Sequence, residues 1–175
     1  MTIKTIFLDR DGVINKDNNY VYKVVDFEFI TGIFDLCLYL KDLGYEIVIV
    51  TNQSGIARGF FNETQYQTLT NWILTQFKNK QINILDILHC PHGPKSECNC
   101  RKPMPGMFLQ AKTKYNINMQ KSWMIGDSER DIIAANLAGI ENTILVTAPP
   151  KKVGGKTQAK FVTNSINNSR EIILK

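Results

Sequence analysis

Residues 7–13 read Phe-Leu-Asp-Arg-Asp-Gly-Val, and this stretch decides the fold that the chain is expected to adopt. The apolar run that begins at Ile3 is typical of a buried strand, and it stops at Asp9, two residues before Asp11. Two carboxylates at the end of a buried strand can converge on one small volume, bind a hard cation, and divide the roles of nucleophile and proton shuttle. A solvated turn is the alternative interpretation, because Asp and Gly are common turn residues.

Short apolar runs alternate with segments of helical periodicity along the rest of the chain. Further strands are predicted at residues 45–50, 85–89, 123–125 and 143–146. Helices are predicted at residues 33–43, after a capping box of Asn62 and Gln65, from Pro105, and at residues 129–137. A short strand and a terminal helix are expected within residues 161–173, and residues 149–160 read as a mobile basic loop. This alternation predicts an α/β fold with a mainly parallel sheet, which binds ligands at the carboxyl ends of its strands.

Length and composition favour one globular domain. The 175 residues suffice for one domain with a full core, so a single domain over residues 1–175 is expected. The longest aliphatic run, residues 47–50, is far shorter than a membrane span, and no signal peptide is recognisable. We therefore expect a cytoplasmic protein without a membrane partner. The net charge of +5 suits an anionic ligand, but the basic residues are scattered, so a nucleic-acid partner is not required.

Three further polar strings lie near predicted strand ends or helix starts. Residues 51–55 read Thr-Asn-Gln-Ser-Gly and offer groups that suit phosphate oxygens, although a plain polar loop has the same composition. Arg101 and Lys102 can neutralise phosphoryl oxygens, but such a pair is more often a solvated surface. Asp127 is placed to complete a metal site with the first two aspartates. Asp131 follows one helical turn later; we favour a role at the helix N-terminus over a contact with water or a cation.

The four strings together resemble the signature of the haloacid dehalogenase superfamily of phosphohydrolases. Asp-x-Asp-Gly, a strand-end Thr, a lone Lys and Gly-Asp-x-x-x-Asp occur in this order between residues 9 and 131. Each string is common alone, whereas the ordered set is specific. The resemblance implies a Rossmann-like core with helices on both faces of the sheet, catalytic Mg²⁺ and an aspartyl-phosphate intermediate. The short intervals between the strings leave no room for a large cap domain, which indicates a capless member.

The resemblance assigns catalytic roles to five residues. Asp9 attacks phosphorus, while Asp11 protonates the leaving oxygen and then deprotonates the hydrolytic water. Thr51 and Lys102 hold the phosphoryl oxygens. Mg²⁺ is held by Asp9, the backbone carbonyl of Asp11, and Asp127, and it screens the repulsion between carboxylate and phosphate.

A cysteine-rich loop at residues 90–100 carries a second metal pattern. Its candidate ligands are Cys90, His92, Cys98 and Cys100. Three thiolates and an imidazole match tetrahedral zinc with no position left open, so we predict a structural Zn²⁺. A disulfide is the alternative, and a cytoplasmic location argues against it. Cys37 is expected to be a small buried hydrophobe, and packing is favoured over metal ligation for His89.

A capless member with this zinc loop is similar to the branch that contains heptose-bisphosphate and histidinol-phosphate phosphatases. Residues 7–13, 51–59 and 100–107 carry the likeness to the heptose enzymes. The resemblance implies a small phosphorylated sugar as substrate, removal of the C7 phosphate of a heptose bisphosphate, and a place in the synthesis of nucleotide-activated heptose for surface polysaccharide. It implies substrate contacts by Asp17, Asn18, Asn19, Tyr20, Thr51, Asn52, Gln53, Ser54, Arg101 and Lys102.

Two departures keep an alternative open. The five-residue spacer between His92 and Cys98 is closer to the histidinol-phosphate enzymes, and Ser128 stands where heptose enzymes carry lysine. Heptose bisphosphate is favoured because the longer strings outweigh a loop length. A nucleic-acid 3′-phosphatase shares the chemistry, but no aromatic-rich basic groove is recognisable. A non-catalytic, zinc-stabilised module has no use for the nucleophile, and nothing in the sequence indicates more than a monomer.

Overall fold

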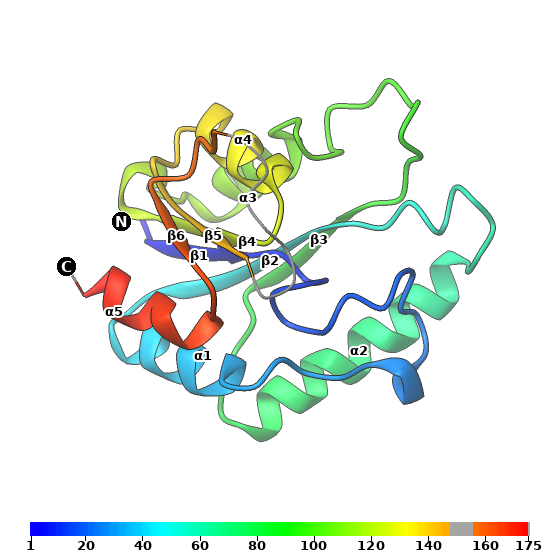
Figure 1. Cartoon of the computed structure of the whole chain (residues 1–175), viewed down its shortest axis with the longest axis horizontal. Coiled ribbons are helices and arrows are strands. Elements are labelled where there is room, and N and C mark those ends of the chain that lie inside the picture. The colour runs from blue at the N-terminus through cyan, green and yellow to red at the C-terminus, as the bar shows by residue number, and fades with distance from the viewer. Residues whose placement is uncertain (148–155, 175) are drawn as a thin grey trace.

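Six strands run through residues 1–147 and 156–174, which the computed structural model describes. They are β1 (Thr5–Leu8), β2 (Glu46–Asn52), β3 (Asp86–Cys90), β4 (Trp123–Gly126), β5 (Asn142–Val146) and β6 (Phe161–Thr163). All of them pair in parallel in one sheet, in the order β3-β2-β1-β4-β5-β6 (Figure 1). The predicted α/β fold with a parallel sheet is confirmed.

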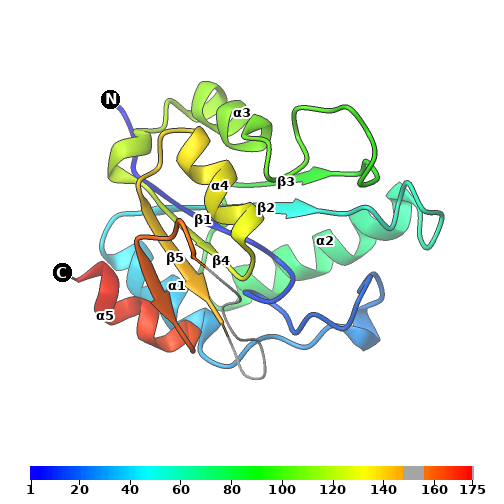
Figure 2. The ribbon, with the colours of Figure 1, turned by 45° about the horizontal axis from the view of Figure 1, so that its top comes forward.

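Helices cover both faces of this sheet (Figure 2). The α-helices are α1 (Ile33–Asp42), α2 (Glu63–Asn79), α3 (Gly106–Tyr115), α4 (Glu129–Leu137) and α5 (Ser169–Ile173). Short 3₁₀ turns lie at Val24–Asp26, Met119–Lys121 and Ile166–Asn168. Helices α1 and α2 pack on one face and α3 and α4 on the other, while α5 packs beside α1. None of the described helices has the length and apolar character needed to cross a membrane.

The alternation of strand side chains builds two cores, one on each face. In β1, Ile6 and Leu8 point into the core with α1 and α2, whereas Phe7 points into the core with α3 and α4. The ring of Phe7 lies against that of Phe108 in α3, with centroids 5.0 Å apart. Because both faces are covered, the strand reads as a continuous apolar run.

The element boundaries follow the local signals in the sequence, with one informative difference. The capping box of Asn62 and Gln65 opens α2, and α4 has the predicted bounds. Strand β2 extends two residues beyond its predicted end at Val50, because Thr51 and Asn52 pair with β3. The expected short strand and terminal helix are present as β6 and α5. Of the predicted basic loop, residues 149–155 lie outside the described residues.

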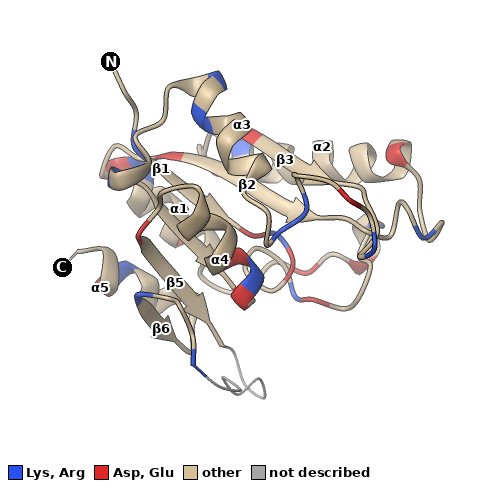
Figure 3. Ribbon diagram, turned by 90° about the horizontal axis from the view of Figure 1, so that it is seen from above, with Lys and Arg blue, Asp and Glu red and all other residues tan. Residues whose placement is uncertain are grey.

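The topology brings the carboxyl ends of β1, β2 and β4 together at one edge of the sheet (Figure 1). Every strand of the described residues belongs to this sheet, in keeping with a capless core. The side chains that follow these three strands therefore share one region, which Figure 3 shows as acidic and basic segments grouped near the start of α4. Ligands of parallel sheets bind at this edge.

Candidate active site

The end of β1 places Asp9 in a nearly enclosed position. The backbone N–H of Asp9 donates to the carbonyl of Ile125 in β4 at 3.0 Å, so strand pairing fixes the backbone at this point. Its side chain is 12% exposed. Burial and the nearby charge of Asp131 raise the pKa of Asp9 well above its ordinary value, against the opposing effect of Lys102. An ionised carboxylate here depends on positive charge beside it.

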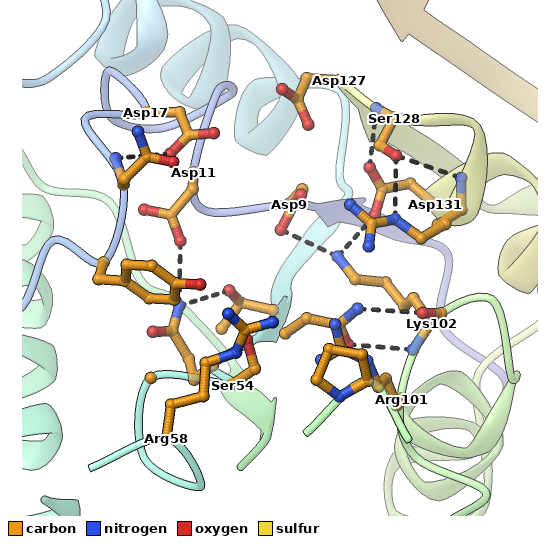
Figure 4. Close-up of a pocket in the computed structure, with 18 residues that line it drawn as sticks. Asp9, Asp11, Asp17, Ser54, Arg58, Arg101, Lys102, Asp127, Ser128 and Asp131 are labelled. Carbon is orange, nitrogen blue, oxygen red and sulfur yellow. Dashed lines mark hydrogen bonds and ion pairs between the residues drawn. The ribbon is translucent and has the colours of Figure 1, made fainter. Parts of the chain in front are cut away.

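Lys102 supplies positive charge from the segment that leads into α3. Its Nζ lies 2.9 Å from Oδ1 of Asp9 and 2.6 Å from Oδ1 of Asp131, as Figure 4 shows. The same ammonium donates to the carbonyl of Val50 at 2.7 Å. Burial by itself would lower the pKa of Lys102, but the charges of Asp131 and Asp9 outweigh it and raise this pKa above its ordinary value. The ammonium is therefore held, charged, beside Asp9.

Asp131 connects the first turn of α4 to this ion pair. Its Oδ2 accepts a hydrogen bond from the backbone N–H of Ser128 at 3.1 Å, which completes the capping box of α4. Its Oδ1 is the atom that pairs with Lys102. The predicted role at the helix N-terminus is confirmed. The structure also shows a contact between Asp131 and a cation, Lys102, which the sequence alone favours less than the helix role.

Three carboxylates form a cluster suited to a hard cation. Asp9, Asp127 and Asp131 each offer one oxygen, and these atoms lie within 4.8 Å of one another. Gly12 has a φ of +86°, and a Cβ there would lie 2.2 Å from Oδ2 of Asp127, so glycine permits the close approach of the two loops. Carboxylate oxygens are the ligands that Mg²⁺ prefers. The donor set therefore fits Mg²⁺, and the side chain of Asp11 is not part of this cluster.

The Asp11 carboxylate is held instead by three donors. Its Oδ1 accepts from Nη2 of Arg10 at 2.8 Å and from Nδ2 of Asn15 at 3.0 Å. Its Oδ2 accepts from Nε2 of Gln53 at 3.0 Å. Arg10 is buried and also donates to the carbonyl of Val21, which anchors it in the loop after β1. The carboxylate of Asp11 thus has a defined orientation at the pocket wall.

These groups line a pocket of about 300 Å³ (Figure 4). Residues that the sequence predicted at the site and that line this pocket are Asp9, Asp11, Asp17, Asn19, Tyr20, Thr51, Asn52, Gln53, Ser54, Arg101, Lys102 and Asp127. Asn18 is exposed and is not among the lining residues, so its predicted contact with substrate stays a prediction. The fold thus brings together strings that lie more than a hundred residues apart in the chain.

The cysteine loop closes on itself beside this pocket. Cys90, His92, Cys98 and Cys100 each offer one ligand atom within 4.8 Å of the others. Their sulfur–sulfur distances are 3.2, 3.6 and 3.8 Å, and Nδ1 of His92 lies 3.2 and 3.5 Å from two of the sulfurs. Ligands about 2.3 Å from a tetrahedral zinc are separated by about 3.8 Å. The four side chains therefore fit zinc, and all four cysteines of the chain are free of disulfides.

His89 is not part of this Cys/His cluster. Its Nε2 lies 3.1 Å from Oε1 of Glu63, and its ring packs on that of Tyr66 with centroids 4.1 Å apart. These contacts join β3 to α2, so the expectation that His89 packs and does not ligate metal agrees with the geometry.

Comparison with known proteins agrees with this arrangement. Residues 99–167 match a family model described as HAD-hydrolase-like. D-glycero-α-D-manno-heptose-1,7-bisphosphate 7-phosphatase of Photorhabdus laumondii is 50% identical over 151 residues, covering 82% of this chain and 82% of that protein. The corresponding β-anomer phosphatase of Vibrio cholerae is 43% identical and covers 100% of this chain and 98% of its own length. The chain belongs to the heptose-1,7-bisphosphate 7-phosphatase family.

A solved member of this phosphatase family has the same fold. D,D-heptose 1,7-bisphosphate phosphatase from B. bronchiseptica, a complex with magnesium and phosphate, superposes with a TM-score of 0.88 at 31% identity and covers 98% of both chains. The recognition of the haloacid dehalogenase superfamily and of its heptose-phosphatase branch is confirmed.

Two pocket cations of this family member were not among the predicted site residues. Arg58 lies in the loop after β2, with its guanidinium 5.7 Å from the ring centroid of Tyr20. Arg130 lies in the first turn of α4, where its Nε donates to Oγ of Ser128 at 3.4 Å. Single exposed arginines carry no spacing signal. The sequence offered only one signal for them: Arg58 lies three residues after the motif at residues 51–55, and Arg130 lies within the motif at residues 126–131.

Proposed function

We propose that this protein is a Mg²⁺-dependent phosphatase that removes the C7 phosphate of D-glycero-D-manno-heptose 1,7-bisphosphate. The observation that carries the proposal is the buried pair of Asp9 and Lys102, set beside Asp127 at the floor of a pocket of about 300 Å³. This arrangement occurs in a chain whose full length is covered by relatives named for that reaction. A nucleophile, an acid–base group and fixed cations are what phosphoryl transfer needs.

Asp9 acts as the nucleophile. One of its carboxylate oxygens bonds to phosphorus while the bond between phosphorus and the C7 oxygen breaks, which leaves an aspartyl phosphate. Asp11 gives a proton to the departing sugar oxygen and afterwards takes one from the water that attacks the same phosphorus. Inorganic phosphate then leaves and Asp9 is regenerated. The three donors around Asp11 support this role because they fix the orientation of a carboxylate that lines the pocket.

Thr51 and Lys102 hold the transferring phosphoryl oxygens. The Thr51 hydroxyl lies at the end of β2, and its Oγ1 accepts from Gln53 at 2.8 Å. The Lys102 ammonium neutralises charge on both the carboxylate and the phosphoryl group, which is worth more in a buried site than in water. Arg101, one residue earlier, binds the part of the substrate away from the reacting phosphate. Its planar guanidinium suits a second phosphate group.

Asp9 and Asp127, with the backbone carbonyl of Asp11, are the residues that would hold Mg²⁺. A bound Mg²⁺ supplies charge that screens the repulsion between the Asp9 carboxylate and the phosphate. Asp131 keeps Lys102 in place beside them through its ion pair.

The loop at residues 17–20 forms the other wall, where Asp17, Asn19 and Tyr20 line the pocket. Loops of this kind define substrate access in a core that has no cap. The loop at residues 90–100 holds a structural Zn²⁺ in this proposal. It runs directly into Arg101, whose Nη1 donates to the carbonyl of His92 at 3.1 Å. Order in the zinc loop therefore supports the position of the recognition residue.

Histidinol-phosphate phosphatase is the second candidate, and the short spacer between His92 and Cys98 is the observation that favours it. The relatives named above match along the whole chain, which weighs against it. A nucleic-acid 3′-phosphatase has less support, because the cations of this pocket lie in one compact site.

The experiment that tests the proposal measures phosphate release in the presence of Mg²⁺. The substrates are both anomers of heptose 1,7-bisphosphate, histidinol phosphate and a 3′-phosphorylated oligonucleotide. We expect kcat/KM for one heptose anomer to exceed that for the other substrates by about 100-fold or more, which corresponds to about 2.7 kcal/mol of transition-state discrimination. Faster turnover of histidinol phosphate would overturn the assignment.

A further inference from the structure

Asn52 places both polar atoms of its side-chain amide on the backbone of a catalytic residue. Its Oδ1 accepts from the N–H of Lys102 at 3.0 Å, and its Nδ2 donates to the carbonyl of the same residue at 3.1 Å. The two residues are 50 positions apart in the chain. The side chain therefore continues the hydrogen bonding of β2 onto a segment that is not a strand.

Strand β2 holds the other end of Lys102 as well. The ammonium donates to the carbonyl of Val50, two residues before Asn52. The peptide and the ammonium of Lys102 are thus both tied to the end of β2, and the side chain spans the distance between the two ties. This double attachment sets where the charge stands relative to Asp9, 2.9 Å away.

Gln53 is committed in a similar way to two other groups of the site. Its Nε2 donates to Oδ2 of Asp11 at 3.0 Å and to Oγ1 of Thr51 at 2.8 Å. A side-chain amide nitrogen has two hydrogens to donate, and both are used here. The residue is buried, so these two bonds are shielded from water. The other oxygen of Asp11 is held separately, by Arg10 and Asn15.

We propose that Asn52 and Gln53 are positioning residues and not substrate contacts. Asn52 acts through Lys102, and Gln53 acts through Asp11 and Thr51. The inference rests on the proposed phosphatase function, in which those three residues touch the reacting phosphoryl group. It replaces the expectation, drawn from family resemblance, that both amides bind substrate. A displacement of about 1 Å in a catalytic group can cost about 100-fold in rate, so amides that touch no substrate still affect catalysis.

A double-mutant cycle tests the proposal with p-nitrophenyl phosphate and Mg²⁺. The variants are Asn52→Ala, Lys102→Met and their combination, and the readouts are kcat and the dissociation constant of inorganic phosphate. We expect Asn52→Ala alone to lower kcat by about 10-fold to 100-fold. In the Lys102→Met background, the same change should alter kcat and phosphate affinity by less than about twofold, because its route of action is gone. Equal factors in both backgrounds would overturn the proposal.

A parallel cycle combines Gln53→Ala with Asp11→Asn. Gln53→Ala should lower kcat of the wild-type enzyme more than it raises KM, and its effect should shrink in the Asp11→Asn background. A change confined to the KM for heptose bisphosphate, with p-nitrophenyl phosphate turnover unaltered, would show a substrate contact and contradict the proposal.

Two controls separate this result from loss of fold and from failure of the proposed function. Asn142→Ala removes an amide that bonds to the carbonyl of Gln120 at 3.2 Å, at the far end of the sheet, and should leave kcat unchanged. If Asn52→Ala fails to fold, Asn52→Ser takes its place, because the shorter hydroxyl cannot make both bonds to Lys102, and its loss of kcat should again vanish in the Lys102→Met background. A wild-type protein without phosphomonoesterase activity would refute the function itself. An active wild type with additive variants would refute only the positioning roles.

Discussion

The ammonium of Lys102 lies 2.9 Å from the Asp9 carboxylate, although the two residues come from segments more than ninety positions apart. Both side chains are almost fully buried, and a second carboxylate, Asp131, balances the pair on the other side at 2.6 Å. A buried ion left without any partner is strongly destabilising, and Lys102 is the cation on which both carboxylates depend. The site is therefore part of the folded core as well as its reactive centre.

Asp9→Asn separates the chemistry of this site from its packing. The amide has nearly the same shape, and Lys102 keeps its partner Asp131. We expect the fold to remain intact and phosphate release to fall by about 10⁴-fold or more, because the nucleophile is gone. Circular dichroism and phosphate release check the two halves of the prediction, and the matched control is Asp35→Asn, at an exposed position in the first turn of α1. Appreciable residual turnover would exclude Asp9 as the nucleophile.

Zinc content is expected to be one ion per chain, measured by elemental analysis of the purified protein. Cys98→Ser removes one of four ligands and should lower the metal content, the thermal midpoint and the activity together, because the loop leads into Arg101 and Lys102. Cys37→Ser is the control, since Cys37 lies on the buried face of α1 and is not one of the four candidate zinc ligands. It should leave the zinc content unchanged. Full zinc loading of Cys98→Ser would contradict the ligand assignment.

Much of the fold could be predicted because its signals are local. Two such signals are the capping box of Asn62 and Gln65 and the apolar period of the helix that follows it. Both lie within a short stretch of the chain, and the structure confirms both. Strand ends were less certain. The extension of β2 to Asn52 depends on pairing with β3, which is a tertiary contact that the local pattern does not contain.

The candidate site also combines features that the local sequence predicts with contacts that only the folded structure shows. Carboxylates and cysteines at fixed spacings could be singled out from the chain alone. What each side chain contacts could not, because the partners of Asn52 and of Asp131 lie 50 and 29 residues away. The second role of Asp131, as the partner of Lys102, is visible only once α4 stands beside the segment before α3. The assignment of a single domain to residues 1–175 stays a prediction.

Alkaline pH should weaken the folded state through Cys37. Burial raises the pKa of this thiol from 9.0 to about 12. Above the unfolded pKa the unfolded chain binds fewer protons than the folded one, so stability is full below about pH 9 and falls as pH rises toward 12. Burial also raises the pKa of Tyr66 to about 12, which adds a similar loss at the upper end of this range.

Urea unfolding of zinc-saturated protein measures this loss. Relative to Cys37→Ala, the wild type should lose up to about 1.4 kcal/mol more unfolding free energy per pH unit above the thiol's unfolded pKa. The variant is less stable at neutral pH because it leaves a cavity, so the comparison is made on slopes. Identical slopes for the two proteins would show that Cys37 does not contribute.

Arg58 provides a test of how the pocket binds the part of the substrate that does not react. It lines the pocket beside Tyr20, away from the ion pair of Asp9 and Lys102, and its exposed guanidinium can meet a second anionic group. We expect Arg58→Gln to raise the KM for heptose 1,7-bisphosphate by about 10-fold, as for loss of one charge-assisted hydrogen bond, with kcat nearly unchanged. Turnover of p-nitrophenyl phosphate, which carries a single phosphate, should stay within about twofold of wild type.

Arg170→Gln is the matched control, because that guanidinium stacks on Tyr39 and does not line the pocket. Equal losses of activity on both substrates would place Arg58 in the chemical step and contradict a role confined to recognition.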